Sequence, residues 1–250
     1  MSKPKLHIAI IGEGKNDVGI MGNSEWQEGT IQEYLRCFLA NDFDLEFTPL
    51  AVSKTETKNI RGLKGGRYRK YKIKGIAKKL FRFVSLYKNR SDFNLLIFFS
   101  DTDKTQGERA SKTEAKRKYQ AILNDINEAK RLLDDEMPNL TLIPMIPIRI
   151  LECWLLGDYE GFENIGCSPQ NPLLPSKPEL VWGDQNDPNG NYPKNYLKRI
   201  LENGGFENNT ETYQLIILNN NLDNLKQNCS LSFAPFAAKM ENYLHQLLKK

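Results

Sequence analysis

The sequence predicts an α/β fold, in which a parallel sheet is flanked by helices and a small helical extension follows at the C-terminus. Two observations support this. Over residues 5–148, short apolar runs rich in β-branched residues alternate with segments of helical period, an order typical of strands joined by crossover helices. The 250 residues are 40% hydrophobic and 26% charged, the composition of a globular chain that can bury a core.

Four strands and three helices are predicted in this first part of the chain. The run at residues 5–11 is mostly apolar and β-branched and ends at Gly12, which favours a buried parallel strand followed by a tight turn. Pro144 and Pro147 place the last strand at an edge of the sheet or at the end of its pairing. The remaining strands are expected at residues 45–52, 93–100 and 141–148, and the helices at residues 27–40, 73–87 and 112–133.

The second part of the chain is less regular. Residues 166–193 are rich in Pro, Asn and Gly and have no periodicity, which is typical of a functional loop or a flexible excursion. Helical patterns occur at residues 150–162, 196–201, 213–225 and 236–248. We therefore predict an α/β domain at residues 1–162 with a basic insertion at residues 54–90, and an irregular loop and helical extension at residues 163–250.

Several classes of protein are disfavoured by composition. The four cysteines form no CxxC pair and there are only two histidines, so a zinc site or a Ser-His-Asp hydrolase is not expected. No apolar run approaches the ~18 residues of a transmembrane helix, and the N-terminus lacks a signal-peptide core. We expect a cytoplasmic protein without a membrane partner, in which any catalysis relies on carboxylates.

Basic residues are concentrated in one segment. Residues 54–90 contain fourteen Lys and Arg and one acid, a local charge of +13 that leaves −9 for the rest of a chain of net charge +4. Such a segment suits a polyanion held by its phosphates, so DNA or RNA is the expected partner. The alternative is a solvated helix face beside a flexible basic loop. The cations expected to contribute most lie in a glycine-containing stretch: Arg61, Lys64, Arg67, Arg69 and Lys70.

Carboxylates follow three of the four predicted strands. Glu13 and Asp17 come after the first strand, Asp101 and Asp103 after the third, and Glu152 after the fourth. Ligands of open parallel sheets bind where strands end, and Asp101 and Asp103 project to the same side of an extended chain. Carboxylate oxygens suit Mg²⁺ or Mn²⁺, so a shared metal site is predicted. Taken singly, each motif also fits a turn or a helix cap.

Four stretches resemble one known family: HIAIIGEGKND, LLIFFSDTD, IPIRILECWLLGD and, less specifically, CSLSFAPFAAKM. They are similar to TOPRIM (topoisomerase-primase) domains, and more closely to uncharacterised bacterial TOPRIM-like proteins and to the TOPRIM part of the overcoming-lysogenization-defect nucleases. The resemblance implies a TOPRIM-like sheet, with Glu13 as general acid or base and Asp101 and Asp103 as Mg²⁺ ligands. It also implies that Asp17 and Glu152 assist a second metal.

The function that this resemblance implies is Mg²⁺-dependent cleavage of DNA or RNA phosphodiesters. The chain lacks the ATPase domain of the overcoming-lysogenization-defect proteins, so an ATPase partner would be a separate chain, as in some phage-defence operons. The alternative is a non-catalytic nucleic-acid-binding or regulatory subunit whose acids bind a structural metal or none. A primase-like enzyme is a weaker third option, because no polymerising or zinc module is visible.

Overall fold

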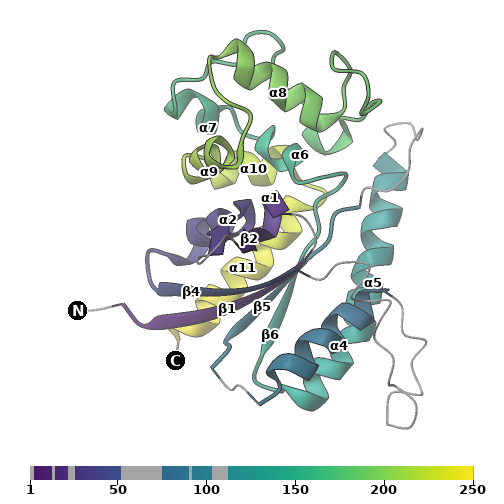
Figure 1. Cartoon of the computed structure of the whole chain (residues 1–250), viewed down its shortest axis with the longest axis vertical. Helices are drawn as coiled ribbons and strands as arrows, with labels where there is room; N and C mark the ends of the chain where they lie inside the picture. Colours follow the sequence, from purple (N-terminus) through teal and green to yellow (C-terminus); the bar gives the residue numbers. More distant parts are fainter. Residues whose placement is uncertain are drawn as a thin grey trace.

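The core of the molecule is a four-stranded parallel sheet with the strand order β4-β1-β5-β6 (Figure 1). Its strands are β1 (Lys5–Gly12), β4 (Asp44–Ala51), β5 (Leu95–Phe99) and β6 (Thr141–Met145). All four predicted strands are therefore present, and β6, with its proline, lies at an edge as expected. The computed structural model describes residues 3–12, 15–21, 26–51, 75–89, 92–102 and 112–249.

Helices cover both faces of the sheet. One face packs against α2 (Thr30–Leu39) and α11 (Phe233–Leu248), and the other against α4 (Gly75–Tyr87) and α5 (Lys112–Glu136) (Figure 1). Side chains of β1 alternate between the two cores: Ile8 and Ile10 enter the first, Ala9 and Ile11 the second. A strand buried on both faces is apolar at successive positions, which explains the unbroken apolar run from Ile8 to Ile11.

The order of the strands places a topological switch point between β1 and β5. From β1 the chain crosses to β4 on one side, and it then returns to β5 on the other side of β1. Ligands of open α/β sheets bind outside the carboxyl ends of the strands at such a change of direction. The segments that follow β1 and β5 therefore flank the position where a ligand is expected.

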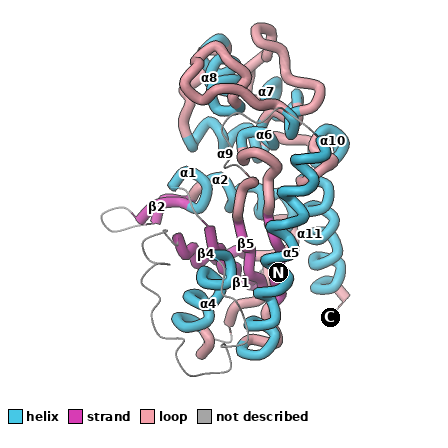
Figure 2. Tube along the Cα trace, turned by 90° about the vertical axis from the view of Figure 1, so that its right-hand side faces the viewer, coloured by secondary structure: helices cyan, strands magenta, loops and turns pink. Residues whose placement is uncertain are grey.

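A small element after β1 was not predicted from the sequence. The chain forms α1 (Lys15–Val18) and then an antiparallel pair of short strands, β2 (Gly19–Met21) and β3 (Trp26–Glu28), before α2 begins. Figure 2 shows this pair projecting from the molecule beside α1. These elements are too short for a periodic pattern to indicate them.

The helical extension caps the sheet and then returns to it. Helices α6 (Glu152–Leu155), α7 (Tyr159–Asn164), α8 (Pro193–Asn203), α9 (Thr210–Leu218) and α10 (Leu222–Asn228) gather at one end of the molecule (Figures 1 and 2). The final helix, α11, packs against α2 and β6. The core on that face contains residues from both parts of the chain, so it crosses the boundary predicted at residue 162. No helix of the described ranges has the length and apolar character to cross a membrane.

Two predicted helices are each divided in the structure. The pattern at residues 150–162 is interrupted at Gly157, where a Cβ atom would lie 2.6 Å from Sγ of Cys229. Asp158 then caps α7 by accepting hydrogen bonds from the backbone N–H groups of Glu160 and Gly161. The pattern at residues 213–225 is divided at Asn221, which caps α10. The single-helix predictions are wrong because these breaks depend on packing and capping, whereas the apolar period continues through them.

The long irregular segment is held firmly against α8. Asn195 donates hydrogen bonds to the carbonyls of Gln185 and Asp187, and Arg199 donates to those of Pro188 and Gly190. Within the segment only the 3₁₀ turn η2 (Pro178–Leu180) is regular. These contacts from α8 satisfy loop carbonyls that no regular ladder serves, so residues 185–190 pack against α8.

Candidate functional site

Three of the predicted acids converge at the carboxyl edge of the sheet. Asp17 lies on α1 after β1, Asp101 directly after β5, and Glu152 opens α6 after β6. Burial raises the pKa of Asp17 from 3.8 to about 7, and the charges of Glu152 and Asp101 add to this rise. Only acids that lie near one another influence a pKa in this way. Segments far apart in the sequence are thus brought within electrostatic range of each other.

The position of Asp17 is set by tight packing at the end of β1. A Cβ atom at Gly12 would lie 2.7 Å from Cγ2 of Val18 and 3.1 Å from Cβ of Phe99, so only glycine lets α1 fold back over the sheet. Gln32 of α2 donates a hydrogen bond of 2.9 Å to the Val18 carbonyl. These contacts hold the turn that carries Asp17 against β5 and α2.

A lysine that the sequence analysis did not identify completes this cluster. Nζ of Lys194, on α8, lies 3.5 Å from Oε1 of Glu152, whose side chain is buried. The charge of Glu152, followed by that of Asp17, raises the pKa of Lys194, and Lys194 in turn lowers the pKa of Asp17. No local pattern points to this lysine, because its partners lie on elements far from it in sequence.

Tyr213 of α9 borders the same cluster. Its pKa is raised above the usual value, first by burial and then by the charges of Glu152 and Asp17. Its hydroxyl donates a hydrogen bond of 2.6 Å to Oδ1 of Asn208. The helical extension therefore supplies the cation Lys194 to the edge of the sheet that carries the acids, and Tyr213 lies within electrostatic range of them.

A buried arginine lies on the β5 and β6 side of the site. The backbone N–H of Arg149 donates a hydrogen bond of 2.7 Å to Oγ1 of Thr102, whose own N–H donates to the Pro147 carbonyl. Arg149 has a positive φ of 68°, a conformation that costs a non-glycine residue energy and is often found at functional sites. Its guanidinium lies 4.9 Å from the centre of the Trp182 ring.

The donor types at this edge suit a hard divalent cation, because carboxylate oxygens are the ligands that Mg²⁺ and Mn²⁺ prefer. Within the described parts of the chain, however, no group of three or more His, Cys, Asp or Glu residues is arranged to hold a metal ion. Two of the expected metal ligands, Glu13 and Asp103, lie outside these parts. A metal held by Asp17, Asp101 or Glu152 would therefore need further ligands from residues outside the described ranges.

The basic residues predicted to bind nucleic acid also lie outside the described ranges: Arg61, Lys64, Arg67, Arg69 and Lys70. The part of the basic segment that is described is α4, whose apolar side chains enter the core beneath the sheet. The helix predicted at residues 73–87 is confirmed there as Gly75–Tyr87.

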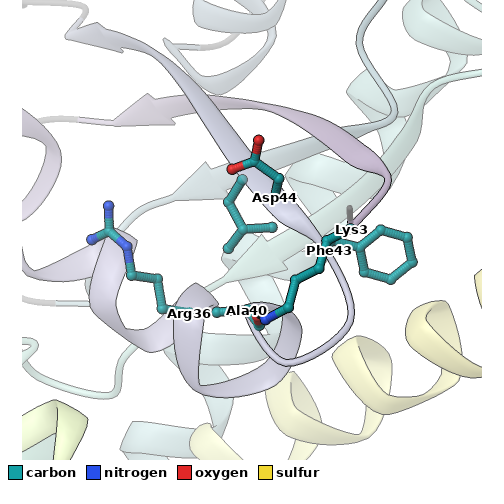
Figure 3. A pocket seen from close by; sticks show the side chains of 6 residues that line it. Lys3, Arg36, Ala40, Phe43 and Asp44 are labelled. Carbon is teal, nitrogen blue, oxygen red and sulfur yellow. Dashed lines mark hydrogen bonds between the residues drawn. The ribbon is translucent and has the colours of Figure 1, made fainter. Parts of the chain in front are cut away.

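A hollow of about 470 Å³ lies at the opposite, amino end of the sheet (Figure 3). Its two cations already have partners: Lys3 donates a hydrogen bond to the Ala40 carbonyl, and Arg36 pairs with Glu28 and Glu33. The remaining lining residues include Phe43 and Asp44. Because both of its cations already have partners within the chain, this hollow offers less to an anionic ligand.

The fold and this edge together define a class: a parallel α/β protein with acids from three strand ends gathered at the topological switch point. Within that class the chain belongs to the family described as Domain of unknown function (DUF4276), whose model matches residues 28–241. The matched part includes Asp101, Glu152 and Lys194 but begins after Asp17. No curated protein and no solved structure matches the chain.

Proposed function

We propose that this protein is a Mg²⁺- or Mn²⁺-dependent nuclease that cleaves DNA or RNA phosphodiesters. The observation that carries the proposal is the placement of Asp17, Asp101 and Glu152 after three adjacent parallel strands, where their charges influence one another. Acids that raise one another's pKa are costly to fold, and such arrangements cluster at functional sites. The resemblance to TOPRIM nucleases adds the reaction class and suggests a phage-defence role with a separate ATPase chain.

The residues of the chain would share the work as follows. Asp101 and Asp103, with Glu13, Asp17 and Glu152, would hold the metal ions, which supply charge neutralisation and an activated water at the scissile phosphate. Glu13 would transfer the proton as general acid or base. Lys194, already beside Glu152, would offset the negative charge of the acids and attract the phosphate to the edge.

The basic segment would hold the nucleic acid across the site. If about five cations neutralise phosphates, log K should fall against log salt with a slope near −3.5 for single strands or −4.5 for duplex. Replacing Arg61, Lys64, Arg67, Arg69 and Lys70 with Ser should flatten this slope. It should also weaken binding similarly for all sequences, because phosphate contacts carry no base information. An unchanged slope would identify the segment as a solvated surface.

The test of the proposal is a cleavage assay with plasmid, single-stranded DNA and tRNA in Mg²⁺, Mn²⁺ or EDTA. Cleavage that requires the metal is expected. Glu13→Gln should retain binding but lose at least ~10²-fold in cleavage, the scale of a positioned acid or base. The nuclease proposal is wrong if no substrate is cut with either metal, also after candidate partner chains have been added.

One observation favours a second function, a non-catalytic nucleic-acid-binding or regulatory subunit. The ion pair between Lys194 and Glu152 compensates part of the acidic charge without any metal, as a purely structural cluster would. Calorimetric titration of Mn²⁺ separates the two functions. A nuclease should bind the metal, whereas a subunit with a self-compensated cluster should not.

A further inference from the structure

Trp182 is a large aromatic side chain that packs against Tyr192 and Arg149 and remains partly exposed to solvent. It lies in the irregular segment before α8, where a Cβ atom at Gly183 would come within 2.8 Å of the backbone nitrogens of Asn191 and Tyr192. Glycine at position 183 thus allows the two segments of this loop to come into contact. The ring of Trp182 meets that of Tyr192 at 5.3 Å and 68°, and Arg149 lies over it.

Two chains of contacts connect Trp182 to the acidic edge. In the first, the guanidinium of Arg149 lies over the indole, and the backbone of Arg149 is bonded to Thr102, the neighbour of Asp101. In the second, Tyr192 packs against the indole and precedes by two residues Lys194, whose ammonium group reaches Glu152. The indole is therefore fixed relative to both sides of the acidic cluster.

From this arrangement we propose that Trp182 is a stacking surface for a nucleobase, so that the site takes single-stranded or locally unpaired nucleic acid. A base inside a duplex is stacked on its neighbours, and only an unpaired base can lie against a side chain. Arg149 and Tyr192 hold the indole in place before the substrate arrives, so that little conformational entropy is lost on binding. This inference rests on the proposed function, to which it adds the class of substrate.

The experiment compares binding of a short oligothymidylate with that of an abasic oligomer of the same length, in EDTA. Both ligands carry the same phosphates, so their difference isolates the contribution of the bases. Wild-type protein should prefer the oligothymidylate by about 10-fold, within the range found for base–aromatic stacking. Trp182→Ala should lose this preference and bind both ligands alike, while Trp182→Phe should keep most of it.

Two controls address folding and specificity. Tyr159→Ala removes another exposed aromatic side chain, 41% exposed on α7, and should leave the preference unchanged. The Trp182→Phe variant keeps an aromatic ring against Tyr192, so a retained preference there shows that the loss in Trp182→Ala is one of stacking and not of folding.

The stacking proposal is overturned if wild-type protein binds both oligomers equally, or if Trp182→Ala keeps the preference. Cleavage with Mn²⁺ is measured on the same samples. A protein that cuts without preferring the oligomer with bases would contradict the stacking proposal alone. A protein that shows the preference but cuts nothing, also after candidate partner chains have been added, would contradict the nuclease proposal alone.

Discussion

Four acids that are wholly or partly buried fall into two groups, which differ in their neighbours. Asp158 and Glu179 form the first group, and Asp17 and Glu152 form the second. Asp158 is fully buried and accepts hydrogen bonds from the backbone N–H groups of Gly161 and Asn221 and from the Asn224 amide. Glu179 accepts from the N–H groups of Leu231 and Ser232 and from the Ser232 hydroxyl. Both carboxylates are surrounded by donors, several of them at helix N-termini.

The acids at the carboxyl edge have other acids as neighbours. The charges of Glu152 and Asp101 raise the pKa of Asp17, and the charge of Lys194 lowers it. Glu179 shows the contrast, because burial raises its pKa while its hydrogen bonds lower it, whereas for Asp17 burial and both neighbouring carboxylates act in the same direction. Burial alone therefore does not distinguish a structural acid from a functional one. The distinction lies in whether the neighbours of the carboxylate are donors or further carboxylates.

The largest expected difference between the two groups of acids is in cleavage activity. It is tested by replacing one aspartate of each group with asparagine. Asp17→Asn should lower the cleavage rate by ~10–100-fold, the range known for disturbed metal sites. It should also abolish the rise in melting temperature that Mn²⁺ causes. Asp158→Asn should leave the cleavage rate per folded molecule unchanged. The two variants are compared by cleavage assay and by melting with and without Mn²⁺. Equal rates in the two variants would remove Asp17 from the site.

The next effect is on stability and runs in the opposite direction. Asp158→Asn replaces one acceptor oxygen by an NH₂ group that faces the donors of Gly161 and Asn221, so we expect a loss of about 2–3 kcal/mol. Urea denaturation in EDTA measures this loss. Asp17→Asn should be neutral or stabilising under the same conditions near pH 7, because it removes a charge from a cluster of like charges. A destabilised Asp17→Asn variant would mean that the carboxylate of Asp17 is structural.

A pH dependence of moderate size should follow from Asp17. Because its folded pKa of about 7 lies above the ordinary 3.8, the folded protein keeps a proton that the unfolded chain releases as the pH rises between these values. The contribution of Asp17 to the free energy of unfolding therefore falls as the pH rises from 3.8 to about 7, and it is constant above that range. The full shift corresponds to ~4 kcal/mol; we expect about half, since the side chain is partly exposed.

Asp17→Asn lacks this titration, which gives the measurement a reference. The variant should match wild-type protein at about pH 4 and exceed it by about 2 kcal/mol at about pH 8 in EDTA. Other titrating groups are common to both proteins and cancel in the difference. A gap that does not change with pH would contradict the assigned pKa of Asp17.

The smallest effect concerns the lysine of the edge, for which α8 provides a matched control. Lys194 and Lys198 are on the same helix and similarly exposed, at 53% and 51%, but Lys198 pairs with Glu202 on its own helix. Lys194→Met should raise the pKa of Asp17 further and cost less than ~1 kcal/mol, whereas Lys198→Met should affect only an exposed pair. NMR titration of the Asp17 carboxyl group measures its pKa in both variants. Equal titration curves would mean that Lys194 does not influence the acids.

Much of the sheet could be predicted from the sequence, but the helical extension could be predicted only in part. Ile8 to Ile11 of β1 and all of β5 are continuous apolar runs because both faces of these strands are buried, and this requirement is visible residue by residue. The breaks at Gly157 and Asn221 were not visible. They depend on Cys229 against Gly157 and on a hydrogen bond from the Asn221 N–H to Asp158, and both contacts join residues distant in sequence.

That acids follow the strands can be read from the sequence, because the alternation of side chains and the ends of apolar runs are local properties. Which of these acids meet depends on tertiary contacts. The order β4-β1-β5-β6 sets the ends of β1, β5 and β6 side by side, and packing of the extension brings Lys194 to Glu152 and Arg149 to Trp182. A periodic pattern records which face of a segment is buried; it carries no information about the partner that buries it, and the chemistry of this edge depends on those partners.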